Sequence, residues 1–414
     1  MPDAIYESDP DLRAEAEDER KRHREAKSNG HDTSRRVIAA TPFRWVDPRT
    51  IPRRQFLYGR HLIRRFVSGK IAPGGYGKSS LTVAEALAMV TSRPLLGDEP
   101  AGKLRVWQIN LEDPEDELQR RFAAAALHYG ITADDIGDRL FVDSGRKVDI
   151  VIATESRDGI EIAVPVVEAI KAEILAKALD VLQIDPFVAC HAVAENDNTK
   201  IAAVARQWAA IAETTGCAIE LVHHARKAAP GQVLTAEDAR GASALLAAVR
   251  SAQVLNGMTK EEAERANIEN PASYFSITNG KSNLAPRSDK VTWRHIVGVP
   301  LGNGDATYDP KGDYVGVVEP WSWPDPFAEV GPEDAKEVQR RIGHGEWRED
   351  QRSTTWAGIV VADVLGLDAS DKAAKAQIRA LVAGWLATGA LRVVTRKDDR
   401  RMNKKFIEVG QWLV

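Results

Sequence analysis

The stretch "APGGYGKSSL", residues 72–81, decides the fold class of this chain. Glycines followed by a Lys-Ser pair are typical of a loop that binds phosphate, in which backbone N–H groups and the start of a helix point at one anion. The strict pattern GxxxxGK[ST] begins with glycine, where this chain has Ala72. Because that position only turns the chain out of a strand, and Pro-Gly-Gly follows it, we interpret the loop as a working nucleotide site.

Each residue of the loop has an expected role in binding ATP. The glycines permit the tight path, Lys78 reaches the β and γ phosphates, and Ser79 ligates Mg²⁺. The predicted nucleotide-binding residues of this segment are Gly74, Gly75, Gly77, Lys78, Ser79 and Ser80. The alternative is a chance Gly-rich turn, which the strand and helix patterns on either side of the loop disfavour.

Strand and helix patterns alternate along most of the chain. "RRFVSGKIA" (64–72) predicts a strand that enters the loop, and "KSSLTVAEALAMVTS" (78–92) predicts the helix that leaves it. Further strands are expected at 103–112, 179–185 and 217–224, and further helices at 114–130, 164–178 and 198–216. Such alternation predicts an α/β fold with a mostly parallel sheet and helices on both faces.

The composition is that of a soluble globular protein, with 43% hydrophobic and 28% charged residues. No apolar run reaches the roughly 18 residues of a membrane helix, and the amino terminus lacks an apolar signal segment. We therefore expect a cytoplasmic protein with no membrane partner. Cys190 and Cys217 are too isolated for a disulfide framework or a zinc site, so we interpret both as small buried residues.

Charge and proline patterns divide the chain into four parts. Residues 1–36 are dense in both charge signs and are expected to form a disordered tail. Residues 37–320 carry the ATPase domain, and residues 321–334, rich in proline and tryptophan, form a linker. Residues 335–414 predict two amphipathic helices and a hairpin, the layout of a small winged-helix-like domain.

The last domain is strongly basic. Between residues 372 and 405 ten side chains are basic and only Asp398 and Asp399 are acidic, which leaves a net charge of about +8. The expected DNA contacts are Lys372, Lys375 and Arg379 on the second helix, with Arg396, Lys397, Arg400 and Arg401 on the wing. The alternative is a solvated hairpin or a surface for another protein, since fold alone does not fix function.

Carboxylates follow two of the predicted strands, at the edge where parallel strands present ligand-binding groups. Asp185 ends "LDVLQID" and is expected to hold the water shell of Mg²⁺. Glu112 ends "VWQINLE" and is the candidate that orients or deprotonates the attacking water, with an exposed surface carboxylate as the alternative. Asp113 precedes Pro114, so we interpret it as a helix N-cap with proline at the first helical position.

Further candidates come from segments later in the chain. His223 and His224 follow "CAIELV" and are expected at the same sheet edge, as sensors of the nucleotide or as simple strand caps. Arg250 lies in "SALLAAVRSAQVL" (243–255), where burial of an unpaired guanidinium is costly. It therefore needs a partner, either an internal carboxylate or a nucleotide across an interface. Lys281, at the end of another strand, is either a second positive charge of that kind or a solvated lysine.

Two loops are candidates for contact with nucleic acid. "ARKAAPGQVLTAEDA" (225–239) is polar, with a Pro-Gly pair and no periodicity. We expect a mobile loop there, in which Arg226 and Lys227 contact phosphates. "HAVAENDNTK" (191–200) contains acidic residues, and we expect it to be solvated.

The order of "APGGYGKSS", "INLEDP", "VLQIDPF", "TTGCAIELVHHARKA" and "RGASALLAAVRSA" resembles the RecA-type AAA family ATPases of the plasmid replicative helicase RepA group. The resemblance covers roughly residues 60–290. It implies a RecA-like phosphate-loop core, ATP and Mg²⁺ as cofactors, and a homo-oligomeric, hexameric ring that acts on single-stranded or forked DNA. It also implies that His224 or His223 senses the γ-phosphate and that Arg250 reaches the nucleotide of the neighbouring subunit.

Three functions from different classes follow. The first is a hexameric, DNA-stimulated ATPase, a helicase of a mobile element or a phage-like replication module. The second is an ATP-switched, DNA-binding recombination mediator or replication regulator that does not unwind DNA. The third, a small-molecule kinase, is disfavoured because the chain offers no evident lid or acceptor-site carboxylate.

Overall fold

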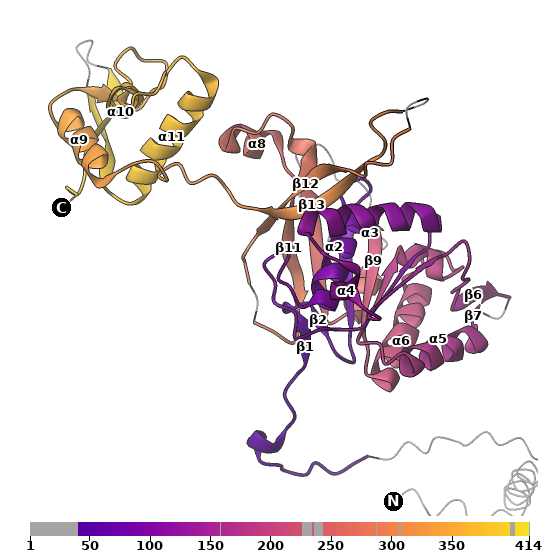
Figure 1. Cartoon of the computed structure of the whole chain (residues 1–414). Coiled ribbons are helices and arrows are strands. Elements are labelled where there is room, and N and C mark those ends of the chain that lie inside the picture. Colours follow the sequence, from indigo (N-terminus) through magenta and orange to yellow (C-terminus); the bar gives the residue numbers. More distant parts are fainter. Residues whose placement is uncertain are drawn as a thin grey trace, which may run out of the picture. The chain divides into compact units, whose positions relative to one another are not determined.

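The structure of the chain is a computed structural model (Figure 1). It describes residues 40–157, 159–225, 234–235, 243–286, 288–305, 307, 309–397 and 402–413. The expected tail, residues 1–36, lies outside them. The chain divides into two units, residues 1–53 and residues 54–414, and the described part of the first contains one short 3₁₀ helix, η1 (Pro48–Thr50).

A nine-stranded sheet forms the centre of the second unit (Figure 1). The strands from β10 to β5 run parallel, and β11, β12 and β13 extend the sheet in antiparallel fashion. The order across the sheet is β13 (Tyr314–Trp321), β12 (Thr292–Pro300), β11 (Tyr274–Ser282), β10 (Ser251–Gly257), β3 (Val67–Pro73), β9 (Ala218–Ala225), β8 (Val181–Asp185), β4 (Val106–Asn110) and β5 (Leu140–Ser144). The predicted α/β class with a mostly parallel sheet is therefore confirmed.

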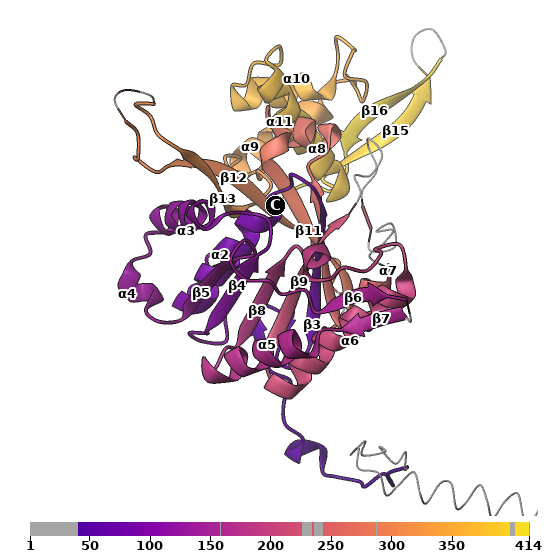
Figure 2. The same ribbon diagram turned by 90° about the vertical axis from the view of Figure 1, so that its right-hand side faces the viewer.

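Helices cover both faces of this sheet (Figure 2). Adjacent residues of a strand point to opposite faces. In β8, Val181 accordingly packs into the apolar cluster that includes α2 and α3, whereas Leu182 packs into the cluster that includes α5 and α6. One face carries α2 (Lys78–Thr91), α3 (Glu115–Tyr129) and α4 (Ala133–Ile136), and the other carries α5 (Val164–Ala176), α6 (Asn198–Thr215) and α7 (Ser243–Ala248).

Short elements complete this part of the chain. They are the antiparallel pairs β1 (Phe56–Tyr58) with β2 (Leu62–Ile63) and β6 (Ala153–Ser156) with β7 (Gly159–Ile162), the helix α8 (Lys260–Ala266), and the 3₁₀ helices η2 (Phe187–Cys190) and η3 (Pro271–Ser273). Cys190 and Cys217 are both buried, as expected. Among the described residues, no helix combines the length and the apolar character that crossing a bilayer requires.

A buried ionic cluster crosses the sheet below the phosphate loop. Lys70 of β3 is fully buried, and its ammonium contacts the carboxylates of Glu85 on α2 and Glu220 on β9, the latter at 3.0 Å. His61 Nε2 lies 3.0 Å from the Glu220 carboxylate, and Gln183 Nε2 donates to it at 2.8 Å. A buried charge needs such partners, because an unpaired one is strongly destabilising.

The parallel strands end together at one edge of the sheet. Pro73, the last residue of β3, is in register with Ala225 of β9, and Asn110 of β4 is in register with Asp185 of β8. Ligands of α/β sheets bind at this carboxyl edge. The phosphate loop therefore opens beside the ends of three other strands.

The carboxyl-terminal part of the chain has a core of its own. Its elements are α9 (Pro332–Gly343), β14 (Trp347–Arg348), α10 (Ala357–Leu365), α11 (Lys372–Ala387), β15 (Leu391–Lys397) and β16 (Asn403–Val409). The three strands form an antiparallel sheet in the order β14-β16-β15. Val338, Val361, Ile378 and Leu381 belong to the apolar cluster that joins the helices.

Two elements of this part, α9 and β14, were not expected from the sequence. The stretch "PEDAKEVQRRIG" of α9 is dominated by charge, and its exposed Lys and Arg residues conceal the helical pattern. Ala335, Val338, Gln339 and Ile342 are its buried residues, at the three- and four-residue spacing of one helix face. That spacing is the feature of the sequence from which α9 could have been predicted.

Candidate nucleotide-binding site

The phosphate loop joins the end of β3 to the start of α2. Gly75 and Gly77 adopt positive φ angles of 86° and 71°, which residues with a side chain rarely adopt. A Cβ atom on Gly77 would also lie 2.7 Å from Ile296 Cδ1. Gly74 has no positive φ, and nothing lies within 4 Å of the Cβ position built on it. The backbone therefore requires glycine at Gly77 for two reasons and at Gly74 for neither.

Ala72, which replaces the first glycine of the strict pattern, lies inside β3. It is in register with His224 of β9 and is fully buried in a cluster with Leu81 and Phe275. Its φ is not positive, so a side chain costs nothing there. The turn out of the strand is made later, at Gly75 and Gly77, which explains how the loop tolerates alanine at this position.

Lys78 is buried at the first turn of α2. Its ammonium donates to the carbonyl oxygens of Pro73 at 2.9 Å and Ala72 at 3.2 Å, and forms no ion pair with any described carboxylate. Burial lowers the pKa of Lys78, and the nearby charges of Asp185 and Glu112 act in the opposite direction. The lysine is thus a cation without a counter-ion, held at the loop by backbone groups.

Ser79 and Asp185 meet beside this lysine. Ser79 Oγ donates to Asp185 Oδ2 at 2.7 Å, while Asp185 Oδ1 is buried and has no hydrogen-bond partner among the described residues. Mg²⁺ takes oxygen ligands and retains several waters. A hydroxyl and an orphaned carboxylate oxygen therefore fit Mg²⁺ with part of its hydration shell.

Glu112 lies in the bend after β4 and is exposed. Its backbone N–H, like that of Asp113, donates to Asn110 Oδ1, at 3.0 Å and 2.8 Å respectively. The prediction that Asp113 caps this helix is wrong. The helix α3 begins at Glu115, and Pro114 occupies the N-cap position without a side-chain cap. Asp113 instead pairs with Arg121 at 2.8 Å, since the helix turns that arginine back toward it.

The two histidines at the end of β9 have different surroundings. His224 lines the cavity, half-exposed, with Nε2 3.9 Å from Asp185 Oδ1. His223 is buried, its ring 6.2 Å from that of Phe187, and its Nδ1 has no partner among the described residues. Burial, helped by the charges of His224, His191 and Lys78, lowers the pKa of His223 to about 4. Of the two, His224 is therefore the one that a ligand could touch.

Lys78, Ser79, Glu112 and His224 line a cavity of about 540 Å³, which we call the nucleotide cavity, whereas Gly74, Asp185 and His223 are not among the described residues that line it. The expected residues that line it are Gly75, Gly77, Lys78, Ser79, Ser80, Glu112 and His224. Sequence reasoning missed the far wall, formed by α3 and by the β12–β13 pair through Arg120, Arg121, Ile296, Asp313, Tyr314 and Gly316. No local pattern marks these residues, because they reach the cavity through the packing of α3 and through the antiparallel extension of the sheet.

Arg250 lies at the opposite edge of the sheet from the phosphate loop. It follows α7 in the turn before β10, and its backbone N–H donates to Val67, the first residue of β3, at 3.0 Å. The expectation that burial forces a partner on Arg250 is wrong, because the chain leaves the helix at Ala248 and exposes the arginine. Its side chain forms no ion pair with any described residue.

Lys281 of β11 lies close to Arg250 but is not simply solvated. Its ammonium donates to the carbonyl oxygens of Leu246 at 2.6 Å and Ala247 at 3.0 Å, in the last turn of α7. Burial, followed by the charge of Arg250, lowers the pKa of Lys281. Arg226 and Lys227 lie outside the described residues.

A family model described as an AAA domain matches residues 32–230, slightly less than half of the chain. Among solved structures, the chain is similar to the one titled "Crystal structure of the RadB recombinase", with a TM-score of 0.38 and 11% identity, over 57% of this chain and 89% of that chain. The family match and the nucleotide cavity together support an ATPase core.

Proposed function

We propose that this chain is a cytoplasmic, Mg²⁺-dependent ATPase of the RepA helicase type, which works as a hexamer on single-stranded or forked DNA. One observation carries the proposal: Lys78, Ser79 and Glu112 line one cavity at the carboxyl edge of a parallel sheet, and Ser79 is hydrogen-bonded to Asp185. Phosphoryl transfer needs a cation for the phosphates, oxygen ligands for a metal and a group that positions water. The AAA domain match supports the same assignment.

The residues of the nucleotide cavity divide the work between them. Lys78 would bind the β and γ phosphates, and Ser79 and Asp185 would hold Mg²⁺, which neutralises charge on the phosphates when bound. Glu112 is open to the cavity, so its carboxylate can orient water or accept its proton. His224 lines the cavity with Nε2 3.9 Å from Asp185 Oδ1, which suits a sensor of the γ-phosphate.

The position of Arg250 supports the proposed oligomer. The seven residues of β3 span about 20 Å between Val67, where Arg250 is bonded, and the phosphate loop. Arg250 is therefore too far from the nucleotide cavity of its own chain to stabilise charge there. If it acts in hydrolysis, it acts on a neighbouring copy, as an arginine finger supplied in trans.

The carboxyl-terminal elements support a winged-helix-like domain. The order α9, β14, α10, α11, β15, β16, with β14 at one side of the β15–β16 hairpin, is the order of elements in that fold. We assign the hairpin as the wing, although Arg400 and Arg401 at its tip lie outside the described residues.

ATP hydrolysis measured with and without Mg²⁺ and single-stranded DNA tests the proposal. We expect hydrolysis that requires Mg²⁺, is stimulated by DNA and is lost in Lys78→Ala, whereas Lys103→Ala, an exposed lysine outside the cavity, retains it. Strand displacement from a forked substrate should accompany hydrolysis. Hydrolysis without displacement would favour the ATP-switched mediator, and hydrolysis indifferent to DNA would contradict both.

A further inference from the structure

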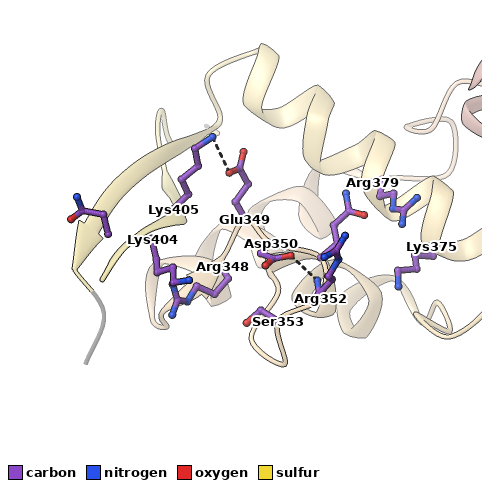
Figure 3. A pocket seen from close by; sticks show the side chains of 11 residues that line it. Arg348, Glu349, Asp350, Arg352, Ser353, Lys375, Arg379, Lys404 and Lys405 are labelled. Atoms are coloured by element: carbon purple, nitrogen blue, oxygen red, sulfur yellow. Dashed lines mark hydrogen bonds and ion pairs between the residues drawn. The ribbon is translucent and has the colours of Figure 1, made fainter. Parts of the chain in front are cut away.

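The carboxyl-terminal part contains a hollow of about 840 Å³ that the ATPase chemistry does not use. Its walls are the segment after β14, one side of α11 and the first residues of β16 (Figure 3). We call it the basic hollow, because six of its lining residues are cations: Arg348, Arg352, Lys375, Arg379, Lys404 and Lys405. We propose that the basic hollow binds the phosphate backbone of a nucleic-acid duplex.

Among the described residues that line the hollow, cations outnumber carboxylates. Glu349 and Asp350 are the acidic residues of this described lining. Glu349 pairs with Lys405 at 3.4 Å, and Asp350 accepts a hydrogen bond from the backbone N–H of Arg352 at 3.0 Å (Figure 3). Lys375, Arg379 and Lys404 form no ion pair with any described carboxylate. Cations crowded in one concave surface attract a polyanion, whose phosphates release counter-ions when bound.

Two of the cations are fixed by aromatic rings. The Arg348 guanidinium lies 4.5 Å from the ring centre of Phe406, and the Lys375 ammonium lies 6.0 Å from that of Trp356. Both rings are 4% exposed, so they hold the cations from beneath. Charges held in place in this way lose less conformational entropy when a ligand binds.

The same burial argues for a duplex and against a single strand. Proteins that bind single strands offer exposed aromatic rings on which unstacked bases lie. None of the eleven described residues that line the basic hollow is aromatic, and Phe406 and Trp356 are covered. A duplex keeps its bases stacked inside and presents phosphates outward, which is what a hollow of cations can contact.

The hollow differs from the DNA surface that the sequence predicts. Lys375 and Arg379 belong to it, but Lys372 does not line it. Arg396, predicted in the wing, stacks on Phe406 at 4.5 Å and pairs with Glu408 at 3.5 Å instead. The remaining cations come from the segment after β14 and from β16, which no helix or wing pattern singled out.

Fluorescence anisotropy of the full chain tests this inference, with a blunt duplex of two helical turns and a single strand of equal length as probes. The measurement is made without nucleotide over a range of salt concentrations. In Arg379→Ala/Lys404→Ala we expect duplex affinity to fall about tenfold or more and the slope of log K against log salt to shrink by about two. Lys336→Ala/Arg340→Ala removes equal charge from α9, outside the hollow, and should leave both unchanged.

The charge-retaining pair Arg379→Lys/Lys404→Arg should keep the duplex slope, which separates loss of charge from loss of structure. An unchanged slope in the alanine pair would overturn the proposal, as would a single strand bound through the hollow as tightly as the duplex. The inference takes DNA as partner from the proposed function, but duplex binding is measured without hydrolysis. A chain that binds duplex through the hollow and hydrolyses no ATP would disprove the proposed function alone.

Discussion

Ser79 Oγ and Asp185 Oδ2 are 2.7 Å apart, which joins the first turn of α2 to the last residue of β8. The contact brings a hydroxyl and a carboxylate together. Asp185 Oδ1 is buried and has no hydrogen-bond partner in the described part of the chain. Both oxygens are of the kind that Mg²⁺ takes as ligands, so the pair fits the proposed metal site.

Asp185→Asn removes the charge of this pair and keeps its size. We expect the Mg²⁺ concentration for half-maximal ATP hydrolysis to rise by about tenfold or more. Initial rates against MgCl₂ at fixed ATP measure this, with Asp134→Asn, an exposed carboxylate of α4, as the control. An unchanged Mg²⁺ dependence in Asp185→Asn would show that Asp185 does not serve the metal.

Glu112→Gln should retain ATP binding and lose turnover, because only the activation of water is affected. A positioned general base contributes about 10² to 10⁴ in rate, and we expect a loss in that range. Single-turnover hydrolysis and nucleotide titration separate the two effects. The matched control is Glu115→Gln, because Glu115 is an exposed carboxylate of α3 that pairs with Lys147. Normal turnover in Glu112→Gln would show that Glu112 is not the group that activates water.

Gly77→Ala should destabilise the chain, since its Cβ would lie 2.7 Å from Ile296 Cδ1 at a φ of 71°. We expect the free energy of unfolding to fall by about 1–3 kcal/mol. Gly74→Ala meets no atom within 4 Å and should change it by about 0.5 kcal/mol or less. Urea unfolding of both variants measures the difference. Equal effects would mean that the loop relaxes around the added methyl group.

His223 should make stability depend on pH. Its folded pKa of about 4 lies below the ordinary value near 6.5, so the unfolded chain binds the proton first as pH falls. The stabilisation is complete above about pH 6.5 and is lost as pH falls toward 4, by on the order of 3 kcal/mol.

The comparison of wild type with His223→Gln isolates this effect. Burial raises the pKa of Glu85 to about 7, which changes stability in the opposite direction over part of the same range. Because Glu85 is present in both proteins, the difference between their urea midpoints from pH 4 to 7 reports on His223. A difference independent of pH would contradict the prediction.

Arg250→Ala should bind ATP normally and hydrolyse it poorly, because the charge is lost from the neighbour's site. Mixed with Lys78→Ala subunits, which still carry the arginine, it should regain part of its turnover at mixed interfaces. ATPase rate against mixing ratio, under conditions of subunit exchange, measures this. Residual activities that simply add at every ratio would contradict action in trans.

The phosphate loop and the metal pair could be predicted because their signals are local. β3, the loop and α2 are continuous in sequence, and Asp185 ends an apolar strand whose neighbours in a parallel sheet end at the same edge. Tyr314 could not be predicted as part of the site, since only the packing of β12 and β13 brings it there. The exposure of Arg250 was missed for a related reason, because helical spacing continues past the residue where α7 ends.

The residues of the basic hollow could also be predicted only in part from the sequence. Lys375 and Arg379 were predicted from the basic charge of residues 372–405 and the helix that they share, whereas Arg348 and Arg352 come from a short strand and the segment after it. A shared surface built from segments far apart in sequence has no period for a sequence pattern to detect.

The buried contact of Lys70 with Glu220 pins the alignment of β3 against β9. Side chains alternate between the faces of a strand, so a slip by one residue would turn Lys70 away from both carboxylates and leave charges buried without partners. Lys70 stands two positions before Ala72, in the strand that delivers the phosphate loop. The register of β3 is therefore fixed by its buried contacts. In the proposed ATPase, the movements that follow hydrolysis then fall to the connections that leave the edge of the sheet.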